Sequence, residues 1–246
     1  MDINSLLKGK ISCACGKSHT CPIKHAVIGK GACARLPEIL SEYRHVLVVA
    51  DCNTYAVGGE LVKAAIADRI ADTLIYETEG VLIPNEEAID TLRTHVRDGI
   101  DLILGIGSGV INDLCKHVSF KHGIRYAIIA TAPSMDGYAS VGAALILEQM
   151  KVTLNARVPY AILAESAILR TAPMDMIRSG YGDIVGKYSC LNDWKLAHLL
   201  RGEYFCDFVF DTVMESVKAV EDKAEALLAR DPEAVRILME ALVNVG

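Results

Sequence analysis

Four residues with metal-binding side chains lie close together near the start of the chain, in the stretch CACGKSHTC (13–21). They are Cys13, Cys15, His19 and Cys21. Thiolate and imidazole groups are the usual ligands of zinc in proteins, but paired ligands are generally separated by about two to four residues. The C-x-C spacing is shorter, and no second ligand pair follows at a distance. We therefore favour a surface hairpin with a tight turn at Gly16–Lys17, and keep a zinc site as the alternative.

A glycine-rich turn in DLILGIGSGVINDLCK (101–116) joins an apolar strand pattern to a helix pattern. Backbone N–H groups at a helix N-terminus bind anions, and glycines let a pyrophosphate approach the backbone closely. The glycines are Gly105, Gly107 and Gly109, a spacing that differs from the G-x-G-x-x-G dinucleotide pattern and from the Walker A loop. The stretch therefore indicates either a dinucleotide site or only a tight strand-to-helix turn.

A second polar stretch, ATAPSMDGYAS (130–140), follows the next predicted strand. Ligands of open α/β sheets bind at the edge formed by the carboxyl ends of the strands, so this stretch should lie beside the glycine-rich turn. Thr131, Ser134 and Ser140 carry hydroxyl groups that can hydrogen-bond a cofactor, and Asp136 can bind a substrate hydroxyl. The Pro-Ser and Asp-Gly pairs are also typical of an ordinary loop.

Two further acids are candidates. Asp183, in SGYGDIVGKYSCLNDW (179–194), lies four residues before Lys187, so the two side chains share one face of a helix. On spacing alone, a surface ion pair is the favoured interpretation. Asp51 ends the first clear apolar strand, where its carboxylate could bind the ribose of a dinucleotide or simply close the strand.

The elements that must position these residues alternate between strand and helix patterns. Apolar runs predict strands at 45–54, 72–78, 101–107 and 125–132. Helical periodicity and end signals predict helices at 55–71, 85–99 and 111–123. This order predicts a parallel sheet with right-handed crossovers.

The pattern changes after the fourth strand. Residues 144–166 contain two or three short apolar runs, and the patterns from Thr171 onward are helical, with one helix predicted over 205–231. We therefore predict an α/β domain with a parallel sheet over 1–170, followed by an all-α domain over 171–246.

Composition excludes several classes of protein. The chain has 246 residues, a net charge of −6 and 52% hydrophobic residues, which is typical of a globular protein and argues against a general nucleic-acid binder. No apolar run reaches the roughly 18 residues of a membrane-spanning helix. Eight cysteines without a secretory signal favour reduced thiols and a cytoplasmic location.

Taken together and in this order, GIGSGVINDL, TAPSMDGYAS and GYGDIVGKYSCLNDW resemble the glycerol-1-phosphate dehydrogenases, in particular their bacterial AraM-like branch. That group is part of the superfamily of dehydroquinate synthases and iron-containing alcohol dehydrogenases. The resemblance extends over most of the chain and implies a dehydroquinate synthase-like fold. The C-x-C-G-x-x-H start also resembles a lead-in of the bacterial branch, which counts further against zinc there.

The resemblance implies a role for each candidate residue. The residues that would contact NAD or NADP are Asp51, Gly107, Ser108, Gly109, Val110, Ile111, Thr131, Ala132, Pro133, Ser134 and Ser140. Asp136 would bind substrate, and Asp183 would bind both substrate and one divalent metal ion, which would be zinc, nickel or iron. The reaction would be the reversible reduction of dihydroxyacetone phosphate, a small phosphorylated three-carbon substrate, to sn-glycerol 1-phosphate. The enzyme would be a homo-oligomer such as a dimer.

The chain departs from this family in its metal ligands. A catalytic zinc usually takes three protein ligands, and the two histidines that accompany Asp183 in the family fall beyond a position corresponding to Gly246. We therefore expect a truncated or incomplete dehydrogenase with weak metal affinity and little turnover.

Two alternatives stay open. One is a polyol dehydrogenase acting on an unphosphorylated substrate such as glycerol, and the other is a truncated, non-catalytic cofactor-binding descendant of the family. A cluster of cations near the nicotinamide end would favour the phosphorylated substrate. The candidate cations are Lys116, Lys121, Lys151 and Lys187.

Overall fold

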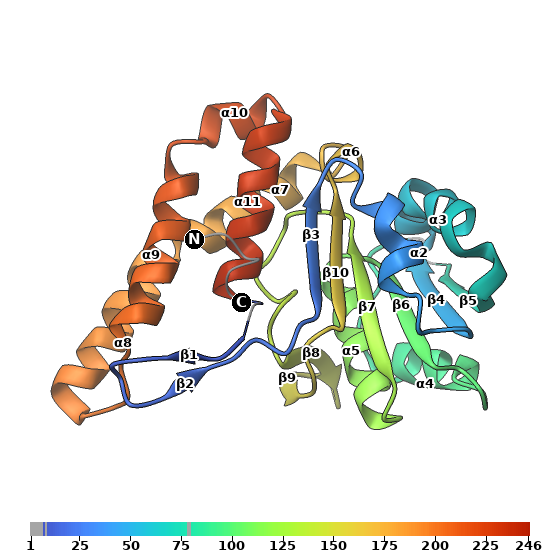
Figure 1. The fold of residues 1–246 in the computed structure, drawn as a ribbon, viewed down its shortest axis with the longest axis horizontal. Helices are drawn as coiled ribbons and strands as arrows, with labels where there is room; N and C mark the ends of the chain where they lie inside the picture. The colour runs from blue at the N-terminus through green and yellow to red at the C-terminus, as the bar shows by residue number, and fades with distance from the viewer. Residues whose placement is uncertain (1–6, 8, 78–79) are drawn as a thin grey trace.

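A six-stranded parallel sheet forms the centre of the computed structural model, which describes residues 7, 9–77 and 80–246 (Figure 1). Its strands lie in the order β3-β10-β7-β6-β4-β5. They are β3 (His25–Gly29), β4 (Val46–Asp51), β5 (Ile70–Tyr76), β6 (Leu102–Gly107), β7 (Arg125–Ala130) and β10 (Ala161–Glu165). Because β6 pairs in parallel with both β4 and β7, the carboxyl ends of these three strands meet at one edge.

Helices cover both faces of the sheet, because successive side chains of each strand point to opposite faces and both sets are apolar. The first helices are α2 (Leu36–Ile39), α3 (Cys52–Ile66), α4 (Glu86–His95) and α5 (Gly109–Lys121). Val48 and Leu104 belong to a core that also contains side chains of α2 and α3. Val49 and Ile103 belong to a second core, which contains side chains of α4 and α5.

The C-terminal part of the chain is a group of helices beside the sheet (Figure 1). They are α6 (Ser166–Leu169), α7 (Met174–Val185), α8 (Lys187–Arg201), α9 (Asp207–Glu221), α10 (Ala224–Leu228) and α11 (Pro232–Val245). The α11 helix packs against α7 and α9 and also contacts β3. Its buried side chains, such as Leu238 and Leu242, join the core on the α5 side of the sheet. A domain boundary near residue 170 stays a prediction.

Two antiparallel hairpins complete the fold, together with the short 3-10 turns η1 (Cys33–Arg35) and η2 (Ala67–Arg69). The hairpin of β8 (Gly142–Leu147) and β9 (Met150–Asn155) packs against α5. The hairpin of β1 (Ile11–Ser12) and β2 (Ser18–His19) lies beside the lower ends of α8 and α9 in Figure 1. The predicted hairpin in the cysteine-rich stretch is therefore confirmed.

The parallel sheet and its alternating helices are confirmed, but two sequence predictions were wrong. The edge strand β3 was not predicted, and the region 205–231 forms two helices, α9 and α10, in place of one. The chain turns at Asp222 and Lys223, which allows Leu227 to be buried where α10 packs against α7 and α11. Thr78, the last residue of the second predicted strand, lies outside the described residues.

Within the described ranges, no helix is long and apolar enough to cross a membrane. The helices α3, α8 and α9 have 15 residues each.

Candidate functional site

The glycine-rich turn connects β6 directly to α5. A Cβ atom on Gly107 would lie 2.5 Å from Cβ of Ile111, so only glycine permits this close packing of the strand end on the first helical turn. Ser108 is the N-cap residue and its side chain makes no capping hydrogen bond. The first N–H groups of α5 therefore keep the capacity to bind an anion.

The loop that follows β7 is hydrogen-bonded to this turn. The backbone N–H of Thr131 donates to the Gly107 carbonyl at 3.1 Å, and the hydroxyls of Ser108 and Ser134 form a hydrogen bond with each other. Tyr138 donates its hydroxyl to the Ala132 carbonyl at 2.7 Å and lies 3.1 Å from Oγ of Ser108. The two predicted cofactor loops thus form one connected surface at the strand ends.

Tyr138 is a residue that the sequence analysis missed. Its side chain is fully buried, and burial raises the pKa of its hydroxyl well above the usual range, so the group stays protonated and serves as a donor. The signal was available, since a tyrosine directly after Asp-Gly in a polar loop is a large side chain that must be buried somewhere.

Lys116 is also buried, and its ammonium hydrogen-bonds the loop that follows β7. Its ammonium donates to the carbonyls of Gly137 and Gly142 at 2.9 and 2.8 Å and to Oγ of Ser140 at 3.2 Å. Burial lowers the pKa of Lys116 to about 8, although the nearby charge of Asp113 acts in the opposite direction. Lys116 is therefore not a surface cation that could bind a phosphate. The Ser140 hydroxyl already accepts a hydrogen bond from it.

Asp136 and Asp183, the two predicted substrate ligands, come together across 47 residues of sequence. The backbone N–H of Asp136 donates to Oδ2 of Asp183 at 2.8 Å. Lys187 forms an ion pair with the carboxylate of Asp136 and lies 3.6 Å from Oδ1 of Asp183. Asp183 on α7 and Lys187 on α8 do form the predicted i,i+4 pair. The pair is part of a three-residue cluster, however, and is not a solvated surface pair.

The two acidic neighbours of Lys187 stabilise its charged form. Burial by itself would lower its pKa, but the hydrogen bond that Lys187 donates to Asp136 and the charges of both carboxylates outweigh burial and raise the pKa of the ammonium above its usual value. The side chains of all three residues are only partly exposed. The cluster therefore combines two carboxylates with one bound cation, a set that can hydrogen-bond a polyol.

A glycine on α7 explains how this cluster is positioned. A Cβ atom on Gly180 would lie 1.9 Å from the carbonyl oxygen of Pro133, so α7 touches the β7 loop backbone to backbone. Asp183 is the next residue on the same helical face, one turn later, and this contact brings it to Asp136.

Asp51 lies at the carboxyl end of β4, next to β6, as the sequence predicted. Its side chain caps α3 by accepting a hydrogen bond from the N–H of Thr54 at 2.9 Å, and the Thr54 hydroxyl is 3.0 Å from the N–H of Asp51. One carboxylate oxygen is therefore committed to the helix, and the other is the oxygen with which Asp51 could bind a ribose.

Three other predicted cofactor residues differ in how exposed they are. Gly109 and Val110 are partly exposed at the start of α5, whereas the Ile111 side chain is buried in the core. Ile111 can therefore contact a ligand only through its backbone.

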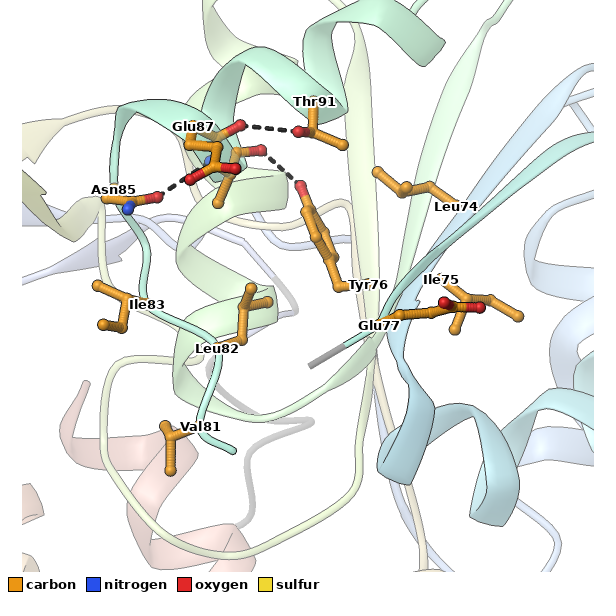
Figure 2. A pocket seen from close by; sticks show the side chains of 11 residues that line it. Leu74, Ile75, Tyr76, Glu77, Val81, Leu82, Ile83, Asn85, Glu87 and Thr91 are labelled. Carbon is orange, nitrogen blue, oxygen red and sulfur yellow. Dashed lines mark hydrogen bonds between the residues drawn. The ribbon is translucent and has the colours of Figure 1, made fainter. Parts of the chain in front are cut away.

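A hollow of ≈540 Å³ lies at the end of β5 and is lined by α4 and the segment before it (Figure 2). Figure 2 shows Tyr76 pointing from β5 toward α4, where its hydroxyl donates to the Ala88 carbonyl at 2.6 Å, and Asn85 capping the helix. None of the predicted site residues lines this hollow.

Comparison with known proteins agrees with the fold and with the motifs. The family described as iron-containing alcohol dehydrogenase matches residues 27–173. The chain belongs to this family. The match includes the glycine-rich turn and the β7 loop, so both loops at the strand ends lie within the region that the family shares.

Two curated relatives of the chain carry the same name. The chain is 34% identical to a glycerol-1-phosphate dehydrogenase [NAD(P)+] of Geobacillus stearothermophilus and 35% identical to one of Halalkalibacterium halodurans. Each match covers 95% of this chain and 60% of the relative. The chain thus spans about three-fifths of the length of these relatives.

Solved structures share the fold. A glycerol dehydrogenase of Schizosaccharomyces pombe superposes with a TM-score of 0.72 at 18% identity, covering 89% of this chain and 58% of that one. An iron-containing alcohol dehydrogenase of Thermotoga maritima gives a TM-score of 0.75 at 14% identity, covering 91% and 66%. The predicted fold class, a dehydroquinate synthase-like arrangement of parallel sheet and C-terminal helices, is confirmed.

This family implies a catalytic metal, but the described residues do not provide a complete set of ligands for it. A zinc site needs at least three protein ligands, and no group of three His, Cys, Asp or Glu gathers around Asp183 in the part of the chain that the structure describes. Oδ2 of Asp183 accepts a hydrogen bond from Asp136, and Oδ1 faces Lys187. His198 donates a hydrogen bond through Nδ1 to the Glu203 carbonyl at 2.6 Å. These residues alone do not fit a metal centre.

Proposed function

We propose that this chain carries the NAD(P)-binding part and the substrate carboxylates of an oxidoreductase that interconverts dihydroxyacetone phosphate and sn-glycerol 1-phosphate. The observation that carries the proposal is the connected surface at the strand ends. There, the β6 turn and the β7 loop are hydrogen-bonded to each other, and Asp136 of the same loop contacts Asp183.

The cofactor half of the proposal rests on backbone groups. The N–H groups at the start of α5 would bind the pyrophosphate, because they have no capping side chain and Gly109 adds no side chain between them and a ligand. Ser134 and Thr131 would hold the neighbouring part of the cofactor, and the second oxygen of Asp51 would bind a ribose hydroxyl. The dihydronicotinamide would supply a hydride to the substrate carbonyl.

The substrate half rests on the Asp136, Asp183 and Lys187 cluster. Two carboxylates can accept hydrogen bonds from the hydroxyls of a three-carbon polyol. The Lys187 ammonium contacts both carboxylates, and it would offer positive charge for a phosphate or for an alkoxide that develops during the reaction. Of the four candidate cations, Lys187 contacts the two carboxylates, and Lys121 and Lys151 are exposed.

A divalent metal, which would be zinc, nickel or iron, is part of the proposal only for a protein that supplies further ligands. The family relatives are longer than this chain, so the missing ligands would lie in sequence that this chain does not contain. We expect the chain itself to bind cofactor and to show little turnover.

The direct test is the oxidation of NADH and NADPH with dihydroxyacetone phosphate, with and without added Zn²⁺, Ni²⁺ or Fe²⁺. The 246-residue chain and a longer form that spans the length of the relatives are assayed side by side. We expect metal-dependent oxidation in the longer form, and its loss in the Asp183→Asn variant of that form. Turnover with glycerol but not with the phosphate would move the proposal to a polyol dehydrogenase.

A second candidate is a non-catalytic cofactor-binding protein. The observation that favours it is the absence of partner ligands for Asp183 among the described residues. Cofactor binding without turnover in both forms, under every metal condition, would support this candidate and contradict the first.

The expected homo-oligomer has one feature in its favour. Leu196, Leu199 and Leu200 of α8 expose 53%, 70% and 74% of their surface, and a stripe of exposed leucines is typical of an interface. We propose a homodimer, which light scattering on the purified chain tests directly. Replacement of Leu199 and Leu200 by Gln should then shift the chain from dimer to monomer.

A further inference from the structure

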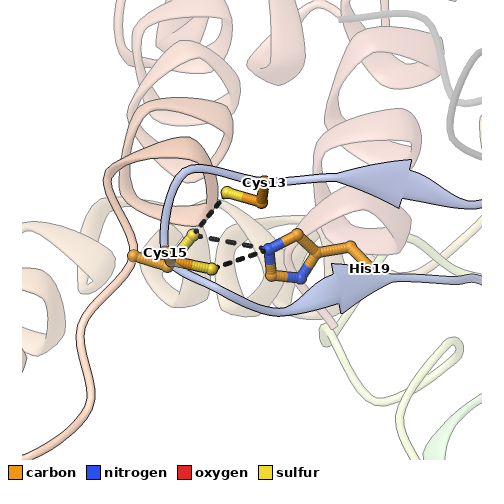
Figure 3. Close-up of side chains that lie close together, drawn as sticks. Cys13, Cys15 and His19 are labelled. Carbon is orange, nitrogen blue, oxygen red and sulfur yellow. Dashed lines mark hydrogen bonds between the residues drawn. The ribbon is translucent and has the colours of Figure 1, made fainter.

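Four metal-binding side chains from opposite ends of the chain meet at the β1-β2 hairpin. They are Cys13, Cys15, His19 and Cys206. One ligand atom from each lies within 4.8 Å of every other. Figure 3 shows the thiols of the hairpin and the imidazole of His19 turned toward one another. The fourth group comes from the residue that precedes α9, 187 positions after His19 in sequence.

The set differs from the one that the sequence suggested. Cys21, the third cysteine of the opening stretch, is not part of the group, and Cys206 takes the fourth position. The sequence analysis counted the short spacing and the lack of a second ligand pair at a distance against zinc, and the structure brings one distant ligand, Cys206, to the group. The short C-x-C spacing is no obstacle here, because the turn with Gly16 at φ +82° brings both thiols to the same side of the hairpin.

The distances fit a tetrahedral ion. Nε2 of His19 lies 3.5 Å from Sγ of Cys15 and 3.5 Å from Sγ of Cys206, and the thiols of Cys13 and Cys206 are 3.6 Å apart. Around a tetrahedral zinc with bonds of about 2.3 Å to sulfur and about 2.0 Å to nitrogen, neighbouring ligand atoms lie roughly 3.5 to 3.8 Å apart. These three distances match such a tetrahedron, and the other three pairs of ligand atoms lie within 4.8 Å.

Little else holds the hairpin in place. Its strands have two residues each, and so short a hairpin is not stable alone in water. Besides the contacts among the four ligands, His19 stacks on Phe208 of α9, with centroids 5.5 Å apart. Tyr204, in the connection between α8 and α9, lies under Lys17 at 3.5 Å and its hydroxyl is 3.2 Å from the thiol of Cys15. All of these contacts surround the four ligands.

We propose that Cys13, Cys15, His19 and Cys206 form a structural zinc site that ties the N-terminal hairpin to the connection between α8 and α9. Four protein ligands leave no open position, so the site is structural and not catalytic. Three thiolates and an imidazole select a thiophilic ion such as Zn²⁺ over Mg²⁺ or Ca²⁺. On binding, the three thiols release their protons, the neutral imidazole keeps one, and no electron is transferred.

The test is metal analysis of the 246-residue chain, purified with zinc and dialysed against a weak chelator. We expect about one zinc ion per chain. Cobalt substitution should give thiolate-to-cobalt charge-transfer bands and the visible bands of a tetrahedral ion. Cys206→Ser and Cys13→Ser should lose the bound zinc.

Two variants serve as matched controls. Cys21→Ser removes a cysteine two residues from His19 but outside the group, and it should keep both the zinc and the charge-transfer bands. Asp183→Asn removes the ligand of the family's catalytic site, and the same result is expected, which separates this proposal from the proposed function. His19→Cys should still bind zinc, with stronger thiolate bands, because four thiolates also form a tetrahedral zinc site.

Three results would overturn the proposal. They are a chain without zinc after dialysis, a cobalt complex without thiolate bands, and a disulfide between Cys13 and Cys206 that forms in place of the metal site when the chain is purified in air with zinc present.

Discussion

Two polar clusters join the C-terminal helical part of this molecule to earlier segments of the chain, and they differ in how their charges are satisfied. In the cluster of Asp136, Asp183 and Lys187, the protein supplies both the anions and the cation, with contacts of 2.8 and 3.6 Å besides the close ion pair. In the cluster of Cys13, Cys15, His19 and Cys206, the thiols and the ring face one another at 3.5–3.6 Å. The second cluster contains no cation of its own.

The difference separates a site that can accept substrate from a site that requires an ion. Carboxylates paired with an ammonium are stable without a metal and can exchange the ammonium contact for a ligand. Thiols form only weak hydrogen bonds, so the second cluster gains little from its own contacts and much from a zinc ion. The predictions below act on one cluster and leave the other as the control.

Removal of zinc should have the largest effect. An ion that binds only the folded state stabilises it by about 4 kcal/mol at a thousandfold excess over its dissociation constant. Thermal unfolding of the chain should therefore shift to lower temperature on addition of a strong chelator, and Asp183→Asn should shift equally. Cys206→Ser should not respond to chelator. An identical response of Cys206→Ser and the wild type would remove the distinction between the clusters.

Gly180→Ala should break the contact that positions the carboxylates. The added Cβ would lie 1.9 Å from the Pro133 carbonyl oxygen, and backbone cannot move aside as a side chain can, so we expect a loss of about 3 kcal/mol in unfolding free energy. Gly182→Ala is the control on the same helix, because its Cβ would meet nothing within 4 Å. It should be neutral or stabilise by about 0.5 kcal/mol. Denaturant unfolding of both variants measures this, and equal stabilities would show that α7 is not packed on the loop.

Lys187→Met should leave two partly buried carboxylates together without a cation. We expect a loss of about 1–2 kcal/mol, less than for a fully buried pair because solvent screens part of the interaction. Asp136→Asn combined with Lys187→Met should recover part of that loss. Denaturant titration of the single and double variants measures the coupling, and strict additivity would mean that the ion pair contributes nothing.

Lys116 and Lys187 should respond to pH in opposite directions. The pKa of Lys116 is lowered to about 8, so the unfolded chain binds more protons, and the contribution of Lys116 to stability should rise between pH 8 and about 10.5. The pKa of Lys187 is raised, so its stabilisation is present below about pH 10.5 and is lost as the pH rises through the higher folded value. The difference in unfolding free energy between the wild type and Lys116→Met should therefore rise between pH 8 and about 10.5, whereas the difference for Lys187→Met should stay constant there and fall only above about pH 10.5.

The sequence predicted the parts of the fold whose signals are local. The strands β4, β6 and β7 are apolar runs followed by polar turns, and the turns carry the motifs. The position of the site at the strand ends could therefore be predicted from the sequence. The strand β3 was missed because five residues with one fully buried side chain at a sheet edge carry little pattern. The break between α9 and α10 depends on the burial of Leu227 against other helices, which no local pattern records.

The side-chain contacts were harder to predict because they depend on distant packing. Asp136 and Asp183 were each identified, but their hydrogen bond depends on the close approach at Gly180. Lys116 was considered as a phosphate-binding cation, although it lies on the buried face of α5. Cys206 could not be connected to the opening stretch without the fold. The sequence analysis therefore considered Cys21 as the fourth ligand, and Cys21 is not part of the group.

The most direct test of the central claim is the binding of NADH and NADPH to the 246-residue chain, measured by calorimetry for the wild type and for Gly109→Ala. The nearest atom to a Cβ on Gly109 is Cγ of Met135 at 3.9 Å, so the free protein should tolerate the change with its melting temperature unaltered. We predict that the wild type binds at least one of the two cofactors, and that the variant binds about tenfold or more weakly, since a methyl group would stand where the pyrophosphate approaches the N-terminus of α5. Equal affinities, or no binding by the wild type, would contradict a dinucleotide site at this turn.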